Sequence, residues 1–320
     1  MEARSKQGSV SRLEFEVEWP PGHVACYLIE GPEPILVDAA LPDHEEAFHD
    51  ALAELGYEPG DIEHVLVTHP HVDHVGLVTM VLEAGDPTVY APAGVRERFA
   101  RDPAALEARV RKNCEAAGFP DEQLETAVDM AVDSLERDAA LLPPESVDAW
   151  IEPGDTTQVG HLEIGAIHVP GHQADHLSYP TEIDGERALL AGDMGIEPFR
   201  PVVMHDGLDD GHREAFEAFY TALDRLAGVD VDRIYPGHGQ IHENLAATVE
   251  RHRESLDERL EQVEELVASG HSTVPAVAAS LAGERDIRYL IPEAMSALAH
   301  LEQNGVITSE SIDGITHYDA

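Results

Sequence analysis

The segment Thr68-His69-Pro70-His71-Val72-Asp73-His74 follows a short apolar run and decides how the rest of the sequence is interpreted. It places three imidazoles and a carboxylate close together, and such groups need partners when they are buried. A divalent cation is one of the few partners that they can share. His69 and His71, two residues apart in an extended chain, point to the same side, whereas Asp73 and His74 begin a turn that reaches a second position. The segment therefore predicts two adjacent metal sites at the end of a strand.

Three later segments repeat this arrangement of an apolar run that ends in a turn with glycine and a ligand-type side chain. They are VPGHQADH with His172, LLAGD with Asp193 and IYPGHG with His238. Glycine lets the backbone approach a site closely, so each turn can bring its His or Asp toward the first segment. Imidazoles and carboxylates without thiolates suit Zn²⁺, Fe or Mn and exclude a closed cysteine-type zinc site.

The order of these four segments resembles the metallo-β-lactamase superfamily, over roughly residues 13–240. The HxHxDH motif, a later glycine-flanked His, an Asp in a GD step and a final His occur in the family's order, and none of the seven positions is lost. The resemblance implies two divalent ions, with zinc as the first choice and iron or manganese as alternatives. It divides the ligands into two sets with one shared carboxylate: His69, His71 and His172 for the first metal, Asp73, His74 and His238 for the second, and Asp193 as the bridge.

Other titratable residues are expected around these ligands or away from them. Asp38 ends the apolar run PILVD, and the resemblance implies that its carboxylate orients a ligating imidazole; the alternative is an Asp that caps a helix. His176 and Asp175 closely follow His172 and are expected to touch the ligands or the substrate, with a surface pair as an equal alternative. The remaining histidines lack partner spacing and are predicted to lie on the surface: His44, His49, His64, His161, His212, His242, His252 and His317.

The apolar pattern predicts an α/β fold, and the resemblance implies the four-layer αββα sandwich of the family. Three short strands are predicted within 13–39, followed by a helix with Asp43 as N-cap and Gly56 at its end. A further helix is predicted at about 75–84, and a long helical stretch at 95–145, broken at GFP, is interpreted as an insertion. Short apolar runs predict further strands at HVLVTH, TVYAP, LEIGAIHVPG, ERALLAGD and DRIYPGHG.

The C-terminal region predicts a second, smaller domain. Three helical patterns and a two-strand pattern suggest a winged-helix-like α+β domain at 251–320, which leaves 1–250 as the metallo-β-lactamase domain. A winged helix that reads DNA needs Arg or Lys on its recognition helix, but PEAMSALAHLEQN has neither, and 251–320 hold 5 basic against 13 acidic residues. Sequence-specific DNA binding is therefore not expected. The domain is expected to act as a lid, a homodimerisation element or a wall of the substrate site.

The charge and the composition of the sequence indicate the salt concentration and the compartment in which the protein is expected to work. There are 63 acidic against 20 basic residues, a net charge of −43, and the only lysines are Lys6 and Lys112. The acids are spread along the chain at helical spacing, as on the folded surfaces of proteins from salt-loving microbes, where a Debye length of about 3 Å at molar salt screens their repulsion. Cys26 and Cys114 lie far apart and are expected to be reduced thiols. Without a predicted membrane span or signal peptide, we expect a halophilic, cytoplasmic protein that does not bind membranes.

The predicted dinuclear site indicates a hydrolase, because two adjacent divalent ions can share a water molecule and lower its pKa toward neutrality. Asp73 is expected to hold that water and help to deprotonate it. The first choice of substrate is a small thioester, ester, lactone or related acyl compound. The alternatives are a lactamase-like endoribonuclease or phosphodiesterase, for which RNA is the partner, and an iron-dependent persulfide dioxygenase with one metal.

One basic stretch stands out in this acidic sequence. Between Arg96 and Lys112 six basic residues face three acidic ones, a net charge of +3. Arg96, Arg98 and Arg101 are therefore candidates to contact an anionic group of the substrate. The alternative, which charge runs generally favour, is that these residues pair with acidic neighbours.

Overall fold

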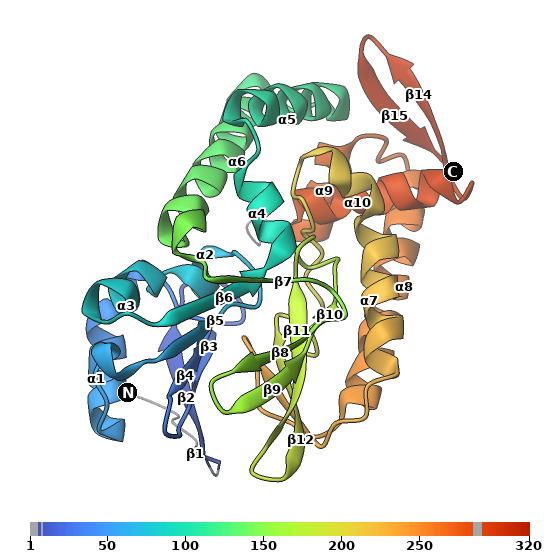
Figure 1. The fold of residues 1–320 in the computed structure, drawn as a ribbon. Coiled ribbons are helices and arrows are strands. Elements are labelled where there is room, and N and C mark those ends of the chain that lie inside the picture. Colours follow the sequence, from blue (N-terminus) through green and yellow to red (C-terminus); the bar gives the residue numbers. More distant parts are fainter. Residues whose placement is uncertain (1–5, 8, 284–289) are drawn as a thin grey trace.

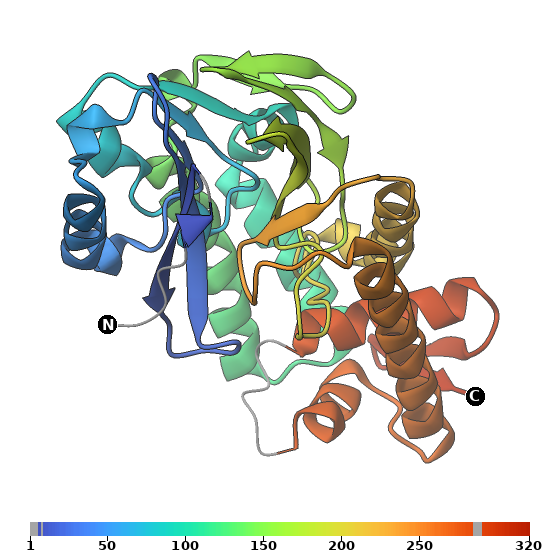
Figure 2. The same ribbon diagram turned by 90° about the horizontal axis from the view of Figure 1, so that it is seen from below.

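Two β-sheets face each other in the middle of the molecule, and helices cover their outer faces (Figure 1 and Figure 2). The computed structural model describes residues 6–7, 9–283 and 290–320. Apolar side chains from the facing strands fill the space between the sheets, among them Tyr27, Tyr179 and Tyr235. The α/β class and the αββα order of layers are therefore confirmed.

The first sheet has seven strands in sequence order. The first four pair antiparallel, and the last three continue the sheet in parallel pairing. Parallel neighbours place their carboxyl ends at one edge, which is where ligands gather in open α/β sheets. The strands are β1 (Lys6–Gln7), β2 (Val10–Glu16), β3 (His23–Ile29), β4 (Ile35–Val37), β5 (His64–Leu66), β6 (Thr88–Pro92) and β7 (Ala149–Ile151).

The second sheet has four strands, with β12 and β13 parallel to each other. A separate antiparallel hairpin precedes it in the chain. The four strands are β10 (Ile167–His168), β11 (Leu177–Ile183), β12 (Glu186–Gly192) and β13 (Arg233–Pro236), and the hairpin is β8 (Thr156–Val159) with β9 (Leu162–Gly165).

Amphipathic helices form the two outer layers. On the first sheet, Phe48 of α1 (Glu45–Leu55) and Val81 of α3 (Val78–Ala84) belong to one apolar cluster with strand residues such as Leu28. On the second sheet, Phe219 of α7 (Ala215–Ala227) and Leu256 of α8 (Leu245–Ala268) share a cluster with Ile234. Short 3₁₀ helices complete the connections, at Pro42–His44, Pro59–Asp61, Pro144–Ser146 and Asp210–Glu214.

Three helices occupy the stretch that was predicted to be helical, between β6 and β7. They are α4 (Ala93–Phe99), α5 (Pro103–Ala117) and α6 (Asp121–Leu141). α6 packs against the short helix α2 (Val72–Val75), which belongs to the HxHxDH segment. The insertion therefore lies directly over the strand ends where the ligands were predicted.

The C-terminal helices share their core with the rest of the protein. The helices α9 (Val274–Ala282) and α10 (Ile291–Gln303) are followed by the hairpin β14 (Thr308–Ile312) and β15 (Ile315–Asp319). The predicted boundary at 250 falls within the continuous helix α8, and one apolar cluster joins residues of α7, α8 and α10. A separate winged-helix domain at 251–320 stays a prediction.

Some expectations for local structure were wrong. No strand was predicted between LEIGAIHVPG and ERALLAGD, yet Leu177–Ile183 form β11, because Tyr179 and Ile183 are buried between the sheets. Asp43 does not cap α1: it lies in a 3₁₀ turn, and His44 holds the N-cap position without a side-chain cap. Gly56 ends α1, as predicted, and has the left-handed conformation.

Among the helices in the described ranges, none is both long and apolar enough to cross a membrane.

Candidate metal centre

The four predicted segments meet at one edge of the paired sheets. The HxHxDH segment follows β5, His172 lies between β10 and β11, Asp193 follows β12 and His238 follows β13. Each ligand-type residue therefore stands at or just beyond a strand end. The fold brings all seven predicted ligands together.

The first set consists of three imidazoles whose nitrogens converge. Nδ1 of His71 lies 3.0 Å from Nε2 of His69 and 3.0 Å from Nε2 of His172. His69 and His172 are buried, so solvent cannot satisfy these atoms. One proton can be shared by two neutral ring nitrogens but not by three, whereas a cation can accept the lone pairs of all three.

The second set lies beside the first and includes a carboxylate. Oδ2 of Asp73 lies 3.2 Å from Nε2 of His238 and 3.8 Å from Nε2 of His74. The ligand atoms of these three residues all lie within 4.8 Å of one another. One carboxylate and two imidazoles are a donor set that divalent transition metals accept.

Asp193 lies between the two sets. Its Oδ2 is 3.2 Å from Nε2 of His172 and 3.3 Å from Nε2 of His238, and its Oδ1 is 3.1 Å from Nε2 of His74. Although close to each other, Oδ1 of Asp193 and Nε2 of His74 form no hydrogen bond and are sealed from solvent. Unsatisfied buried polar atoms are rare in proteins, and a cation between the two sets would satisfy both.

Hydrogen bonds on the outer side of the imidazoles fix which nitrogen faces the centre. Nδ1 of His74 lies 2.8 Å from Oδ2 of Asp38, Nδ1 of His172 is 3.1 Å from the carbonyl of Val202, and Nδ1 of His238 is 2.6 Å from the carbonyl of His23. Each Nδ1 must donate to these acceptors, which leaves the lone pair of Nε2 directed inward.

Thr68 connects Asp38 to a second imidazole. Its hydroxyl donates to Oδ2 of Asp38 at 2.8 Å and can accept from Nδ1 of His69 at 3.0 Å. Its backbone N–H also donates to Asp38, at 2.8 Å. Asp38 thus lies where the resemblance implied and orients imidazoles in both sets, directly for His74 and through Thr68 for His69.

The electrostatics of the centre favour added positive charge. Burial alone lowers the pKa of His74, but the carboxylates of Asp193, Asp73 and Asp38 together raise it well above its usual value. The pKa of His238 is likewise lowered by burial but raised by Asp193 and Asp73, to about 10. Burial lowers the pKa of His69 and His71 far below the usual range, so both stay neutral with free lone pairs. Without metal ions, protonated imidazoles must balance the buried carboxylates.

His176 contacts the ligands and is not part of a surface pair. Its Nε2 accepts a hydrogen bond of 3.0 Å from the backbone N–H of Asp193, and its ring stacks on His69 with centroids 4.5 Å apart. A Cβ atom at Gly192, where φ is +55°, would lie 2.5 Å from Nε2 of His176, so this close approach requires glycine.

Most of the basic residues in the insertion are paired with acidic ones. Arg98 donates to Oδ1 of Asp206 at 2.9 Å, and Arg101 donates to the same atom at 3.3 Å. Arg109 forms two hydrogen bonds with Asp209, at 2.7 and 2.8 Å. Arg98 and Arg101 therefore follow the alternative prediction, in which these residues pair with acidic neighbours. Arg96 is exposed, and contact of any of these arginines with substrate stays a prediction.

Several other histidines were misplaced or missed in the sequence-based predictions. His212 and His252 were expected on the surface but are buried. His23 was not singled out, although its carbonyl holds His238 and its Nε2 accepts from the N–H of Gly239 at 2.9 Å. His205 was also missed: it is buried, has a φ of +49°, and its N–H donates to the carbonyl of His172 at 2.7 Å. Both act on the ligands through backbone atoms, which no side-chain motif reveals.

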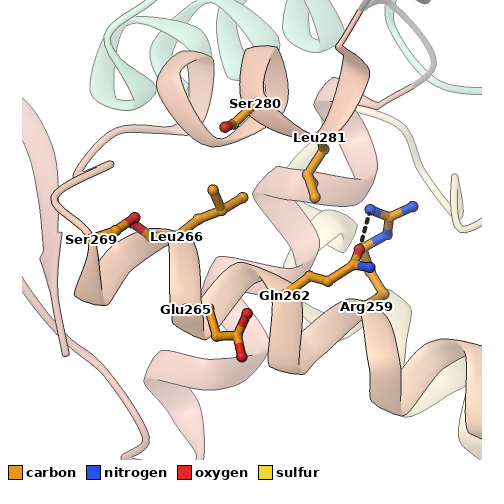
Figure 3. Close-up of a pocket in the computed structure, with 7 residues that line it drawn as sticks. All are labelled: Arg259, Gln262, Glu265, Leu266, Ser269, Ser280 and Leu281. Carbon is orange, nitrogen blue, oxygen red and sulfur yellow. Dashed lines mark hydrogen bonds between the residues drawn. The ribbon is translucent and has the colours of Figure 1, made fainter.

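A separate hollow of about 600 Å³ lies between α8 and α9 (Figure 3). Arg259 donates hydrogen bonds to Gln262 and to Glu293, which also pairs with Arg200. The hollow contains none of the predicted ligands. Its lining residues are Arg259, Gln262, Glu265, Leu266, Ser269, Ser280 and Leu281.

Comparison with known proteins agrees with the geometry. Residues 19–238 match the family model of the metallo-beta-lactamase superfamily. A hydroxyacylglutathione hydrolase of Rhodopseudomonas palustris (strain BisB5) is 25% identical over 227 residues, which cover 70% of this chain and 68% of that protein. The probable metallo-hydrolase YqjP of Bacillus subtilis (strain 168) is 25% identical over 301 residues, 90% of each chain.

Solved structures extend the likeness beyond residue 238. A metallo-beta-lactamase family protein from Thermus thermophilus superposes with a TM-score of 0.80 at 26% identity, covering 97% of this chain and 98% of that one. A beta-lactamase domain protein from Burkholderia ambifaria shares the fold, with a TM-score of 0.76 at 21% identity over 98% and 92% of the two chains. The match of the family model over most of the chain, with the ligand sets at its strand ends, shows that this chain is a hydrolase of the metallo-beta-lactamase superfamily.

Proposed function

We propose that this protein hydrolyses a small thioester, ester or lactone and uses two divalent metal ions, with zinc as the first choice. The observation that carries the proposal is the second ligand set. Asp73, His74 and His238 lie together and are joined to the first set by Asp193. A site for one metal would need only one of the two sets.

The seven ligands would hold the ions, and the surrounding residues would fix the ligands. Bound divalent ions supply two kinds of chemistry, the acidification of water and the polarisation of an acyl oxygen. Burial raises the pKa of Asp73, but His74 and His238 outweigh it and keep the carboxylate ionised. Asp73 can therefore accept a hydrogen bond from the attacking water and help to remove its proton.

The acyl substrate class is supported by relatives and by the surface charge. One relative is named as a hydrolase of hydroxyacylglutathione, at 25% identity. α10 has no Lys or Arg, and a net charge of −43 gives little electrostatic attraction for the phosphates of RNA. The persulfide dioxygenase alternative, which uses one iron, leaves the second ligand set without a role.

Metal analysis combined with a substrate panel tests the proposal. The intact protein would be analysed by mass spectrometry and assayed in multimolar KCl with a thioester, an oxygen ester, a lactone, a phosphodiester and a labelled RNA. We expect two zinc ions per chain and turnover of the acyl substrates. One iron per chain, or cleavage of RNA without turnover of any acyl substrate, would overturn the proposal.

A variant pair separates loss of a ligand from a general effect of charge. Asp73→Asn removes a carboxylate of the second set, while Asp86→Asn makes the same change at an exposed position. We expect Asp73→Asn to lose turnover and one of the two metals, and Asp86→Asn to keep both. Full turnover of Asp73→Asn would contradict the role of the second set.

A further inference from the structure

The chain that follows Asp193 lies against the turn that carries His172. This chain, residues 194–205, is called the ligand-flanking loop. The carbonyl of Val202 accepts from Nδ1 of His172 at 3.1 Å. The N–H of His205 donates to the carbonyl of His172 at 2.7 Å. The loop therefore fixes both the ring and the backbone of a candidate ligand of the first set.

The loop also holds the turn of His238, in the second set. The carbonyl of Glu197 accepts a hydrogen bond of 2.8 Å from the N–H of Gln240, two residues after His238. A Cβ atom at Gly239, where φ is +79°, would collide with the same carbonyl, so this close approach requires glycine. One irregular segment thus begins at one candidate ligand and contacts the turns of two others.

The helix α8 holds the outer side of the ligand-flanking loop. The guanidinium of Arg251 donates to the carbonyl of Ile196 at 2.8 Å and to that of Phe199 at 3.3 Å. It also pairs with the carboxylate of Glu197. The ring of His252 donates to the carbonyl of Ile196 at 3.0 Å. Because a guanidinium presents its N–H groups in a fixed plane, Arg251 ties three residues of the loop together.

The helix α10 holds the loop through a buried carboxylate. Nη1 of Arg200 donates to Oε2 of Glu293 at 3.2 Å, and Nη2 donates to Oε1. Glu293 is 2% exposed and also accepts from Arg259 of α8 at 3.0 Å. A buried ion pair gives little net stability over apolar packing, yet it keeps its partners together, because either charge alone is costly to bury. Such a pair suits a residue that fixes the position of a loop.

We propose that the C-terminal helices α8 and α10 hold the ligand-flanking loop in place and thereby position ligands of both metal sets. Arg251 and Glu293 are the positioning residues on the helices, and Arg200 is the partner of Glu293 on the loop. Groups that orient metal ligands raise the affinity for the metal. The C-terminal region thus contributes to metal binding although it supplies none of the seven candidate ligands. This inference rests on the metal ions of the proposed function and not on its substrate.

Metal affinity tests the inference separately from turnover. Arg200→Gln removes the loop's partner of Glu293, while Arg259 still donates to that carboxylate. Arg251→Gln removes the guanidinium from the carbonyls of the loop. The affinity of each intact protein for Zn²⁺ would be measured by competition with a chromophoric chelator at one KCl concentration, and its free energy of unfolding by urea with excess chelator. We expect each variant to bind zinc about 10-fold more weakly than the unaltered protein.

Two control variants break ion pairs of the same helices outside the loop. Arg213 donates to Glu302 of α10 at 3.3 Å. Arg253 of α8 donates to Asp224 of α7 at 2.6 Å. We expect Arg213→Gln and Arg253→Gln to bind zinc as tightly as the unaltered protein. A loss of zinc affinity in all four variants in proportion to their loss of unfolding free energy would overturn the positioning role, because it would indicate a general effect on the fold.

Co²⁺ in place of zinc adds a spectroscopic readout, because its visible absorption depends on the geometry of its ligands. We expect Arg200→Gln and Arg251→Gln to change this absorption and the two controls to leave it unchanged. Arg200→Lys keeps a positive charge beside Glu293 and is expected to recover part of the zinc affinity. If zinc affinity and Co²⁺ absorption stay the same in Arg200→Gln and Arg251→Gln, the role of the C-terminal helices is overturned and the proposed function stands. An unaltered protein that binds no divalent ion would overturn both.

Discussion

Oδ2 of Asp38 lies 2.8 Å from Nδ1 of His74, and both side chains are buried. Asp38 stands at the end of β4 with a φ of +58°, a conformation that Asp and Asn tolerate better than most residues. The same carboxylate accepts hydrogen bonds from the backbone and the hydroxyl of Thr68. One residue of the first sheet thereby sets the position of the HxHxDH segment.

We predict that Asp38→Asn weakens metal binding while leaving the fold intact. Asn keeps the shape and tolerates the positive φ, but it lacks the charge that orients Nδ1–H of His74. Loss of such an orienting partner costs about 10- to 100-fold in metal affinity. Competition with a chromophoric chelator would measure the change, with the exposed Asp43→Asn as control. Equal affinities for the two variants would contradict the role of Asp38.

The convergence of the seven candidate ligands was predictable from sequence because each is marked by its own neighbours. An apolar strand, a glycine and a His or Asp occur within a few residues in LLAGD and IYPGHG, and strand ends of one sheet edge lie together. The burial of His252 depends on a segment that is distant in the sequence, since its ring bonds to the carbonyl of Ile196. No local pattern carries that information.

The same reasoning explains the errors in secondary structure. In β11 the polar residues Ser178 and Glu182, together with Pro180, which lacks an N–H, hid the alternate core residues Leu177 and Tyr179. β11 forms because it pairs with β12 in the sheet. This pairing outweighs the low strand propensity of Pro180 and Glu182. The insertion, by contrast, has long periodic patterns, and its helical character and the break at GFP were predicted, whereas the break between α4 and α5 was not.

Removal of a ligand from either set is predicted to abolish turnover and reduce metal content together. His71→Ala opens the first set, and Asp193→Ala removes the carboxylate between both sets. We therefore expect Asp193→Ala to lose more metal than His71→Ala. Mass spectrometry under native conditions would give the metal count, with the exposed His49→Ala as control. An active variant without metal would refute the assignment of these residues.

The surface charge predicts that stability depends on salt. With 63 acidic and 20 basic residues, repulsion among exposed carboxylates opposes folding in dilute buffer and is screened at molar salt. We expect the midpoint of thermal unfolding to rise between dilute and multimolar KCl. A midpoint that is the same at both salt concentrations would exclude adaptation to high salt.

The pairing of Arg109 with Asp209 is predicted to hold the insertion against the segment that follows β12. Two parallel hydrogen bonds of 2.7 and 2.8 Å join the groups, and the side chain of Asp209 is 8% exposed. A double-mutant cycle with Arg109→Gln and Asp209→Asn, measured by urea unfolding at fixed KCl, should give a coupling of about 1 kcal/mol. The more exposed pair Arg187 and Asp230 serves as control and should couple less. A coupling near zero for Arg109 and Asp209 would show that this ion pair does not hold the insertion in place.

His252 of α8 makes the stability of the fold depend on pH. Burial lowers its pKa to about 4, its Nε2 donates to the carbonyl of Ile196 at 3.0 Å, and its sealed Nδ1 has no hydrogen-bond partner among the described residues. In the unfolded chain the pKa is about 6.5, so between pH 6.5 and 4 the unfolded state binds the extra proton. The free energy of unfolding must therefore fall as the pH falls through this window, by up to about 3 kcal/mol from this residue, with no contribution above it. Urea unfolding at several pH values should show a weaker pH dependence for His252→Gln than for the unaltered protein, whereas the exposed His49→Gln should keep the full dependence. A His252→Gln curve parallel to that of the unaltered protein would mean that His252 takes up its proton without loss of the native packing.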